Sequence, residues 1–192
     1  MVNKILLVLL IISMLLAGCS SEKAPLDERK ASELFKFVAI DDPVKISYKT
    51  FSMIKPRDWK EVVRENNVII YLPPKSDEKD PFSEKFGIIV SFLPENNTAS
   101  LREITENDVE ESIKASPGVE FSGKYYDARL GQLDGLKIEF VNRVEDRELE
   151  STQIRALHGN VFYAFTQQCL KGKCKYTDVF EEMIASFEWK NP

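Results

Sequence analysis

Histidine and cysteine are scarce in this chain, which has one histidine and three cysteines among its 192 residues. A nucleophile–histidine–acid triad needs a histidine as its base, and a structural zinc site needs four ligands that are mostly cysteine or histidine. The sequence offers almost no material for either. Glycine-rich phosphate loops and the motifs Gly-x-Ser-x-Gly and His-Glu-x-x-His are also absent. These absences point away from the common hydrolases, nucleotide-binding proteins and metalloproteases.

A strong charge of either sign is lacking as well. Lysine and arginine number 26, aspartate and glutamate number 31, and the formal net charge is −5. Nucleic-acid-binding proteins draw their affinity from a basic face, so this balance argues against nucleic acid as a partner. Hydrophobic residues make up 43% of the chain and charged residues 30%, as in an ordinary globular protein. The length of 192 residues suits one domain, with or without a tail.

The N-terminus has the pattern of an export signal. Lys4 supplies a positive charge, and residues 5–16 form an apolar run that only Ser13 interrupts. A transmembrane helix needs about 20 apolar residues, so this run is short for one and suits the apolar region of a signal peptide. The run ends in Leu-Ala-Gly-Cys at residues 16–19, which resembles a prokaryotic lipobox. A plain signal peptide, or an uncleaved anchor with an incidental cysteine, is the alternative interpretation.

The lipobox resemblance implies that Cys19 carries lipid. A diacylglyceryl group on the thiol supplies two acyl chains such as palmitate, and two chains anchor a protein stably where one does not. We therefore predict a signal peptide over residues 1–18, a lipidated N-terminus and tether over residues 19–43 and one domain over residues 44–192. The lipid bilayer is the expected partner, and the expected location is the extracytoplasmic face of the cell membrane. Residues 26–40 suit either a helix or a strand.

Apolar patterns predict mostly strands after residue 43. Apolar and polar residues alternate over residues 46–53, with a change of phase near Thr50 that indicates a turn or bulge, and they alternate again over residues 136–140. Near-continuous apolar runs at residues 68–72, 86–93 and 161–165 are typical of strands buried on both faces. Such strands need cover on both sides of the sheet.

Two helices are predicted, and we expect them to pack on the two faces of the sheet. Ser100 and Glu103 form a capping-box pair in front of an apolar stripe at helical spacing. Thr177 and Asp178 offer an N-cap for a second helix over residues 179–188. The predicted fold class is therefore α+β, an antiparallel β-sheet with helices packed on both faces in an α/β/α sandwich.

The order of these elements resembles the PsbP-like fold, which includes the PsbP subunit of photosystem II, the Mog proteins and DcrB-like envelope lipoproteins. The residues that carry the resemblance are F-S-M-I-K-P-R-D-W at 51–59, S-L-R-E at 100–103, Gly135 before an alternating strand, and I-A-S-F at 184–187. The resemblance implies an antiparallel sheet between helices and a binding module rather than an enzyme. Because members of the group bind unrelated partners, it implies no particular ligand.

Cys169 and Cys174 are separated by four residues, among them Gly172, which eases a turn. In an exported chain such a pair is expected to form a disulfide. A redox pair or a metal site is the alternative interpretation. Redox pairs usually have two intervening residues, and a zinc cage needs two further ligands that the neighbouring sequence does not offer.

The other candidate residues are weaker. His158 is expected in a solvated turn, and the sequence marks no nucleophile or acid to work with it. Asn96 begins an Asn-Asn-Thr sequon, which makes it a candidate for glycosylation. No residue is predicted to be catalytic, to bind a cofactor or to hold a metal.

The predicted function is that of a membrane-anchored, non-enzymatic binding module that holds an envelope protein or a small ligand. One alternative is an envelope thiol–disulfide protein that uses Cys169 and Cys174. Another is a solute-capturing accessory of a transporter, which predicts an apolar pocket with a few converging polar groups.

Overall fold

The structure, a computed structural model, describes residues 43–64, 67–116 and 118–190. The predicted signal peptide, Cys19 and the tether up to residue 42 lie outside these residues. The helices are α2 (Leu101–Ala115) and α3 (Thr177–Ala185). The strands are β1 (Pro43–Ser47), β2 (Phe51–Pro56), β3 (Lys60–Arg64), β4 (Val68–Leu72), β5 (Lys85–Phe92), β6 (Val119–Leu130), β7 (Leu133–Val144), β8 (Arg147–His158), β9 (Val161–Leu170) and β10 (Glu188–Trp189). Within the described ranges, no helix has the length and apolar character needed to cross a membrane.

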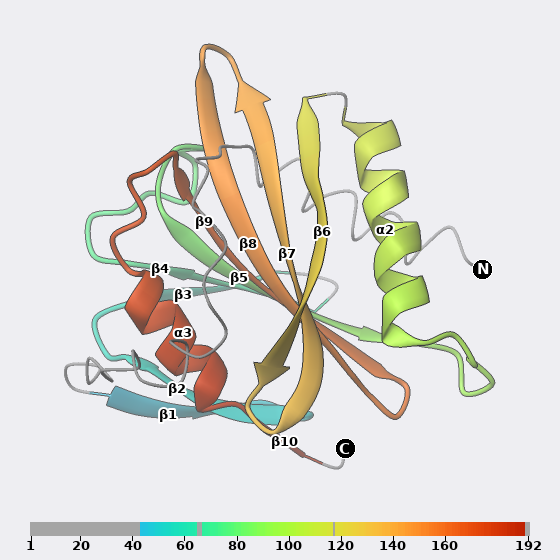
Figure 1. The fold of residues 1–192 in the computed structure, drawn as a ribbon. Coiled ribbons are helices and arrows are strands. Elements are labelled where there is room, and N and C mark those ends of the chain that lie inside the picture. Colours follow the sequence, from blue (N-terminus) through green and yellow to red (C-terminus); the bar gives the residue numbers. More distant parts are fainter. Residues whose placement is uncertain (1–42, 65–66, 117, 191–192) are drawn as a thin grey trace, which may run out of the picture.

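The strands form two antiparallel sheets. The larger has seven strands in the order β3-β4-β5-β9-β8-β7-β6, and the smaller has three in the order β1-β2-β10. Strands β6 to β9 are the long ones, and they cross the molecule as a twisted ribbon (Figure 1). Figure 1 also shows α3 beside the small sheet on one side of the molecule and α2 on the other.

One face of the large sheet packs against α3 and the small sheet. Its core is rich in aromatic rings, including Phe86, Phe165 and Phe187, which bury large apolar areas. Phe51 of β2 lies 5.5 Å from Phe187 and 6.1 Å from Phe165 between ring centroids. The small sheet and α3 therefore cover the same apolar face.

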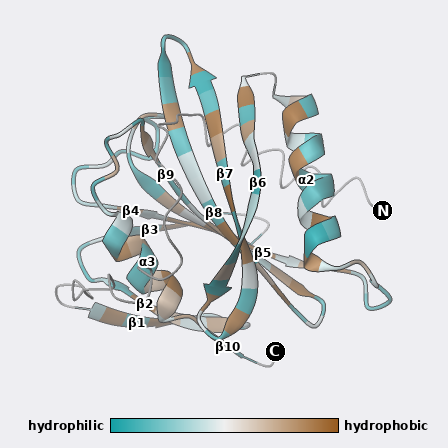
Figure 2. Cartoon of the chain, viewed as in Figure 1, coloured by the Kyte–Doolittle hydropathy of each residue, from teal (hydrophilic) through white to brown (hydrophobic). Residues whose placement is uncertain are grey.

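The opposite face packs against α2. Leu101 and Ile104 lie against a cluster centred on β4, β5 and β9, and Val109 belongs to a second cluster with Ile138 and Phe140 of β7. Apolar and polar segments alternate along α2, as expected of a helix with one buried face (Figure 2). The predicted α+β class and the antiparallel sheet are confirmed. The sequence did not predict the second sheet, which shares with α3 the covering of one face.

The start of α2 confirms the predicted capping box. The Oγ atom of Ser100 accepts a hydrogen bond from the backbone N–H of Glu103 at 3.3 Å. The carboxylate of Glu103 accepts one from the backbone N–H of Ser100 at 2.7 Å. The hydroxyl of Ser100 also donates to this carboxylate, at 2.7 Å. Because the backbone N–H and the hydroxyl of Ser100 both stabilise the ionised carboxylate, they lower the pKa of Glu103.

Candidate functional site

A cavity of about 350 Å³ lies between α3 and the large sheet. This volume is within the ~300–1,000 Å³ range of small-molecule sites. Strands β6 to β9 form the floor of the cavity and α3 forms its roof. The residues that line it are Arg129, Gly131, Lys137, Thr152, Ile154 and Gln167 on the floor and Thr177, Phe180, Glu181, Ile184 and Ala185 on the roof.

Strand pairing explains why the floor residues lie together. Thr152 and Ile154 are two residues apart in β8, so their side chains point to the same face of the sheet. Lys137 of β7 is the register partner of Ile154, and Gln167 of β9 is the register partner of Thr152. The floor therefore has a polar end at Thr152 and Gln167 and a more apolar centre at Ile154.

Helical spacing explains the roof. Phe180 and Glu181 come three and four residues after Thr177, and Ile184 comes four and three residues after them, which places all four on one face of α3. Phe180 and Ile184 are buried in the core, whereas Thr177 and Glu181 are exposed at the margin. The roof thus presents apolar surface bordered by polar groups.

Glu84 holds the N-terminal end of α3. Its Oε2 atom accepts a hydrogen bond from the backbone N–H of Lys175 at 2.9 Å, and Oε1 accepts one from the N–H of Tyr176 at 3.1 Å. Oε1 also accepts one from Nε2 of Gln167 in the cavity floor at 2.9 Å. A carboxylate that receives the N–H groups at a helix start performs the role of an N-cap.

The predicted N-cap of this helix is therefore wrong. Thr177 and Asp178 lie inside the first turn of α3, and the N-cap residue is Tyr176, whose side chain makes no capping bond. The carboxylate oxygens of Glu84 serve as the acceptors instead, although Glu84 lies 91 residues before Lys175 in the chain. No local sequence pattern marks so distant a partner.

Gly131 holds the other end of the roof. Its backbone N–H donates a hydrogen bond to the carbonyl oxygen of Ile184 at 2.9 Å. Its φ is +56°, and a Cβ atom at this position would lie 1.9 Å from the carbonyl oxygen of Phe187. Only glycine combines this backbone conformation with so close an approach.

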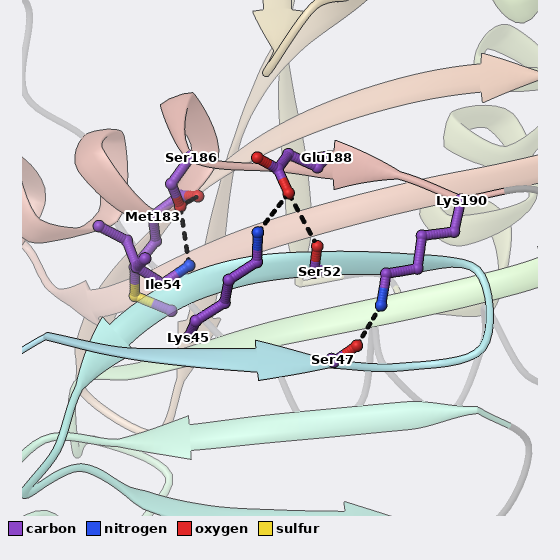
Figure 3. Close-up of polar contacts among 8 residues, drawn as sticks. All are labelled: Lys45, Ser47, Ser52, Ile54, Met183, Ser186, Glu188 and Lys190. Atoms are coloured by element: carbon purple, nitrogen blue, oxygen red, sulfur yellow. Dashed lines mark hydrogen bonds and ion pairs between the residues drawn. The ribbon is translucent and has the colours of Figure 1, made fainter.

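The small sheet fixes the chain directly after α3 (Figure 3). The Oγ atom of Ser186 accepts a hydrogen bond from the N–H of Ile54 at 3.0 Å and donates one to the carbonyl oxygen of Met183 at 2.8 Å. Glu188 then pairs with Lys45 at 2.6 Å. The predicted extension of the helix to residue 188 is wrong, because residues 188 and 189 pair with β2 as the strand β10.

Charges of both signs border the cavity. Partial burial raises the pKa of Glu181, the nearby Asp178 raises it further, and Lys137 across the cavity lowers it. The ammonium group of Lys137 also pairs with Glu139 at 2.9 Å. A bound solute with a charged end can therefore find either a cation or a carboxyl group at the margin.

The predicted cysteine pair is brought together. Cys169, buried at the end of β9, and Cys174 form a disulfide pair whose Cα atoms are 5.2 Å apart. Cys169 is two residues beyond Gln167 on the same face of β9, and Cys174 comes shortly before Thr177. The pair therefore ties the start of α3 to the strand that forms the polar end of the cavity.

The remaining predicted residues lie elsewhere. His158, at the end of β8, stacks on Trp189 with ring centroids 3.8 Å apart and does not line the cavity. Asn96 lies exposed in the turn after β5, and its glycosylation stays a prediction. Cys19 lies outside the described residues, so its lipidation also stays a prediction.

The cavity residues themselves were missed at the level of sequence. Thr152, Gln167 and Lys137 look like ordinary polar positions of strands, and Glu181 looks like the solvated face of a helix. Only the pairing of β7, β8 and β9 and the position of α3 over these strands bring them together.

No protein-family model and no curated protein matches the sequence. Among solved structures, the chain is similar to a protein of Bacteroides thetaiotaomicron with a TM-score of 0.52 and 17% identity. That match covers 73% of this chain and 45% of the other, so this chain spans less than half the length of the Bacteroides protein. At this identity the likeness concerns the fold alone.

Two further structures are similar at lower scores. LpqN, described as involved in cell envelope biogenesis of Mycobacterium tuberculosis, has a TM-score of 0.49 at 13% identity, with 78% of this chain and 90% of that chain covered. A Pseudomonas aeruginosa protein of unknown function has a TM-score of 0.42 at 15% identity, with 66% and 82% covered. Fold and site together define an antiparallel α+β domain with a cavity under α3.

Proposed function

We propose that this chain is a membrane-anchored, extracytoplasmic binding protein without enzymatic activity, and that it holds a small solute in the cavity under α3. The observation that carries the proposal is the cavity itself, whose volume of about 350 Å³ suits a small organic molecule. Its lining has the composition expected of such sites, with an apolar centre and a few polar groups that fix orientation. The solute-capturing version of the sequence prediction is therefore favoured over a module that holds only a protein partner.

The chemistry of the lining favours a solute with an apolar part and a polar end. Ile154, Phe180 and Ile184 offer apolar surface for the first part. Thr152 and Gln167 offer a hydroxyl and an amide at one end of the floor for the second. Binding of this kind needs no reaction, which agrees with the absence of a catalytic motif from the sequence.

The N-terminal sequence supports the location in this proposal. The N-terminal sequence up to Cys19 has the charge, the apolar run and the small residues of a lipobox. We also propose that the domain is PsbP-like, with α2 and α3 as the helices on the two faces of the sheet. The proposed cavity function and the proposed anchor of two acyl chains together suit a solute-binding accessory of a membrane transporter.

The proposal is tested by ligand capture on the full chain extracted in detergent. Native mass spectrometry should show the acylated protein with an additional small molecule, and a solute screen should find compounds that raise its melting temperature. Thr152→Trp fills the polar end of the floor and should abolish both effects. Ile113→Trp places the same ring on the exposed side of α2 and should leave them unchanged.

Two results would count against the proposal. If Thr152→Trp keeps the bound molecule at wild-type occupancy, the cavity is not the binding site. If no molecule co-purifies and no solute in the screen stabilises the protein, the small-ligand function fails. The anchor has its own test, because Cys19→Ala should move the folded protein from the membrane fraction to the soluble fraction.

A further inference from the structure

A carboxylate lies beside the cysteine pair. Glu150 of β8 is the register partner of Cys169 in β9. Its Oε1 atom is 3.6 Å from Sγ of Cys169 and 3.0 Å from Sγ of Cys174. One oxygen and two sulfur donors thus lie within 4.8 Å of one another.

These three atoms form a donor set that suits a thiophilic divalent cation. Zinc is held by thiolate sulfur at about 2.3 Å and by carboxylate oxygen at about 2.0–2.2 Å in tetrahedral geometry. Those bond lengths place neighbouring sulfur and oxygen ligands about 3.6 Å apart. The distance from Glu150 to Sγ of Cys169, 3.6 Å, matches this value. The distance to Sγ of Cys174, 3.0 Å, is shorter, so Cys174 has to move away from the carboxylate when the ion enters.

We propose that the reduced pair binds one Zn²⁺ ion through Cys169, Cys174 and Glu150, with water as the fourth ligand. The chain is synthesised with free thiols, so this state is available before the disulfide forms. Binding releases the two thiol protons to solvent and forms two sulfur–zinc bonds and one oxygen–zinc bond, with no electron transfer. From the disulfide form, a dithiol must first supply two electrons and two protons and become a disulfide itself.

The local chain allows the two sulfurs to separate. A tetrahedral site requires about 3.8 Å between them, well beyond the length of a disulfide bond. Cys169 is fixed and buried in β9, whereas Cys174 follows a turn in which Gly172 has a φ of +65°. Cys174 is the half-buried member of the pair, so the metal and its water reach the site from this side.

Charge around the site is also suitable. Two thiolates and one carboxylate carry three negative charges, and the ion compensates for two of them. Lys171, one residue beyond β9, already pairs with Glu148, the next residue of β8 on the same face as Glu150. Glu148 therefore resembles Glu150 in chemistry and strand but has its own cationic partners, and it serves as a matched control.

The experiment uses the full chain in detergent, reduced with a phosphine that is then removed, and titrated with Co²⁺ as a spectroscopic probe for zinc. Wild type should bind one Co²⁺ per chain with thiolate-to-cobalt charge-transfer absorption, and Zn²⁺ should displace it. Glu150→Gln should weaken Co²⁺ binding about tenfold or more. Glu148→Gln should stay within about twofold of wild type, and the oxidised protein should show no charge-transfer band.

Three outcomes would overturn the proposal. Reduced wild type that shows no charge-transfer band has no dithiolate site. Equal affinity of Glu150→Gln and wild type removes the carboxylate from the ligand set. Equal loss in Glu148→Gln makes the effect one of general charge. Circular dichroism of each variant, and the Cys169→Ser/Cys174→Ser protein as the baseline, separate loss of ligand from loss of fold. Metal binding at this site is measured independently of solute binding in the cavity, so either proposal can fail without the other.

Discussion

Arg155 of β8 and Asp108 of α2 form a buried ion pair with 2.5 Å between Nη2 and Oδ2. The two side chains are 3% and 7% exposed. Gln153, two residues earlier in β8, accepts hydrogen bonds from Nε and Nη2 of the same guanidinium at 3.0 and 2.7 Å. The pair joins α2 to the face of the sheet opposite the cavity.

Breaking this pair should destabilise the protein strongly. Asp108→Asn leaves the charge of Arg155 buried without a counter-charge, which is expected to lower the free energy of unfolding by about 3–5 kcal/mol. Denaturant unfolding measures the loss. The double variant Asp108→Leu/Arg155→Met removes both charges. It should therefore be more stable than the single variant Asp108→Asn. A single variant within about 1 kcal/mol of wild type would contradict this view of the pair.

Removing Glu84 should loosen the start of α3. Glu84→Ala leaves the N–H groups of Lys175 and Tyr176 without their acceptor, and the free energy of unfolding should fall by about 2 kcal/mol. Hydrogen exchange should rise at residues 175–180 and stay unchanged in α2. Glu95→Ala, in an exposed turn, is the control. Unchanged exchange at the start of α3 would show that Glu84 is not its cap.

Lys85 should make the free energy of unfolding vary with pH in the alkaline range. Burial lowers its pKa from the ordinary 10.5, and the nearby Asp80 and Glu78 offset part of that shift. Between the lowered pKa and 10.5, the unfolded chain binds more protons than the folded protein. The free energy of unfolding therefore receives from Lys85 a contribution that rises with pH in this window.

Lys85→Met tests this dependence. The variant should be more stable than wild type near pH 7, and the difference between the two should shrink as the pH rises toward the ordinary lysine pKa. Chemical unfolding at several pH values measures it, with the exposed Lys60→Met as control. A constant difference across the range would exclude a titrating Lys85 as its cause.

Gly131→Ala should distort the end of the cavity. The added Cβ meets the carbonyl oxygen of Phe187 in addition to the strain of a positive φ. Gly123→Ala is a matched control, because Gly123 has a φ of +74° and nothing within 4 Å of the added atom. The control should lose about 1 kcal/mol from backbone strain, and Gly131→Ala should lose about 3 kcal/mol or more by calorimetry. Equal losses of stability in the two variants would show that the contact between the added Cβ and the carbonyl oxygen of Phe187 does not destabilise the protein.

Local patterns predicted much of the fold. The capping box at Ser100 and Glu103 located α2, since both partners lie within one helical turn. The continuous apolar runs located β4, β5 and β9, because burial on both faces leaves a direct trace in the sequence. These features depend on residues that are close together in the chain.

Features that depend on distant residues were not predicted. Glu148 and Glu150 belong to β8, which extends the hairpin beyond the apolar core. Glu150 meets Cys169 only through strand pairing, and Glu84 meets α3 only through the tertiary fold. Polar residues on a strand carry no sign of which partner they will face, so neither the cavity nor the cysteine–glutamate cluster was visible beforehand.

The roof of the cavity is tied at both ends, by Glu84 and the cysteine pair at one and by Gly131 and Ser186 at the other. If the chain binds a solute as proposed, walls fixed in this way would keep the same outline with and without the solute. The proposed role would then be delivery of a solute rather than transmission of a signal by a change of shape.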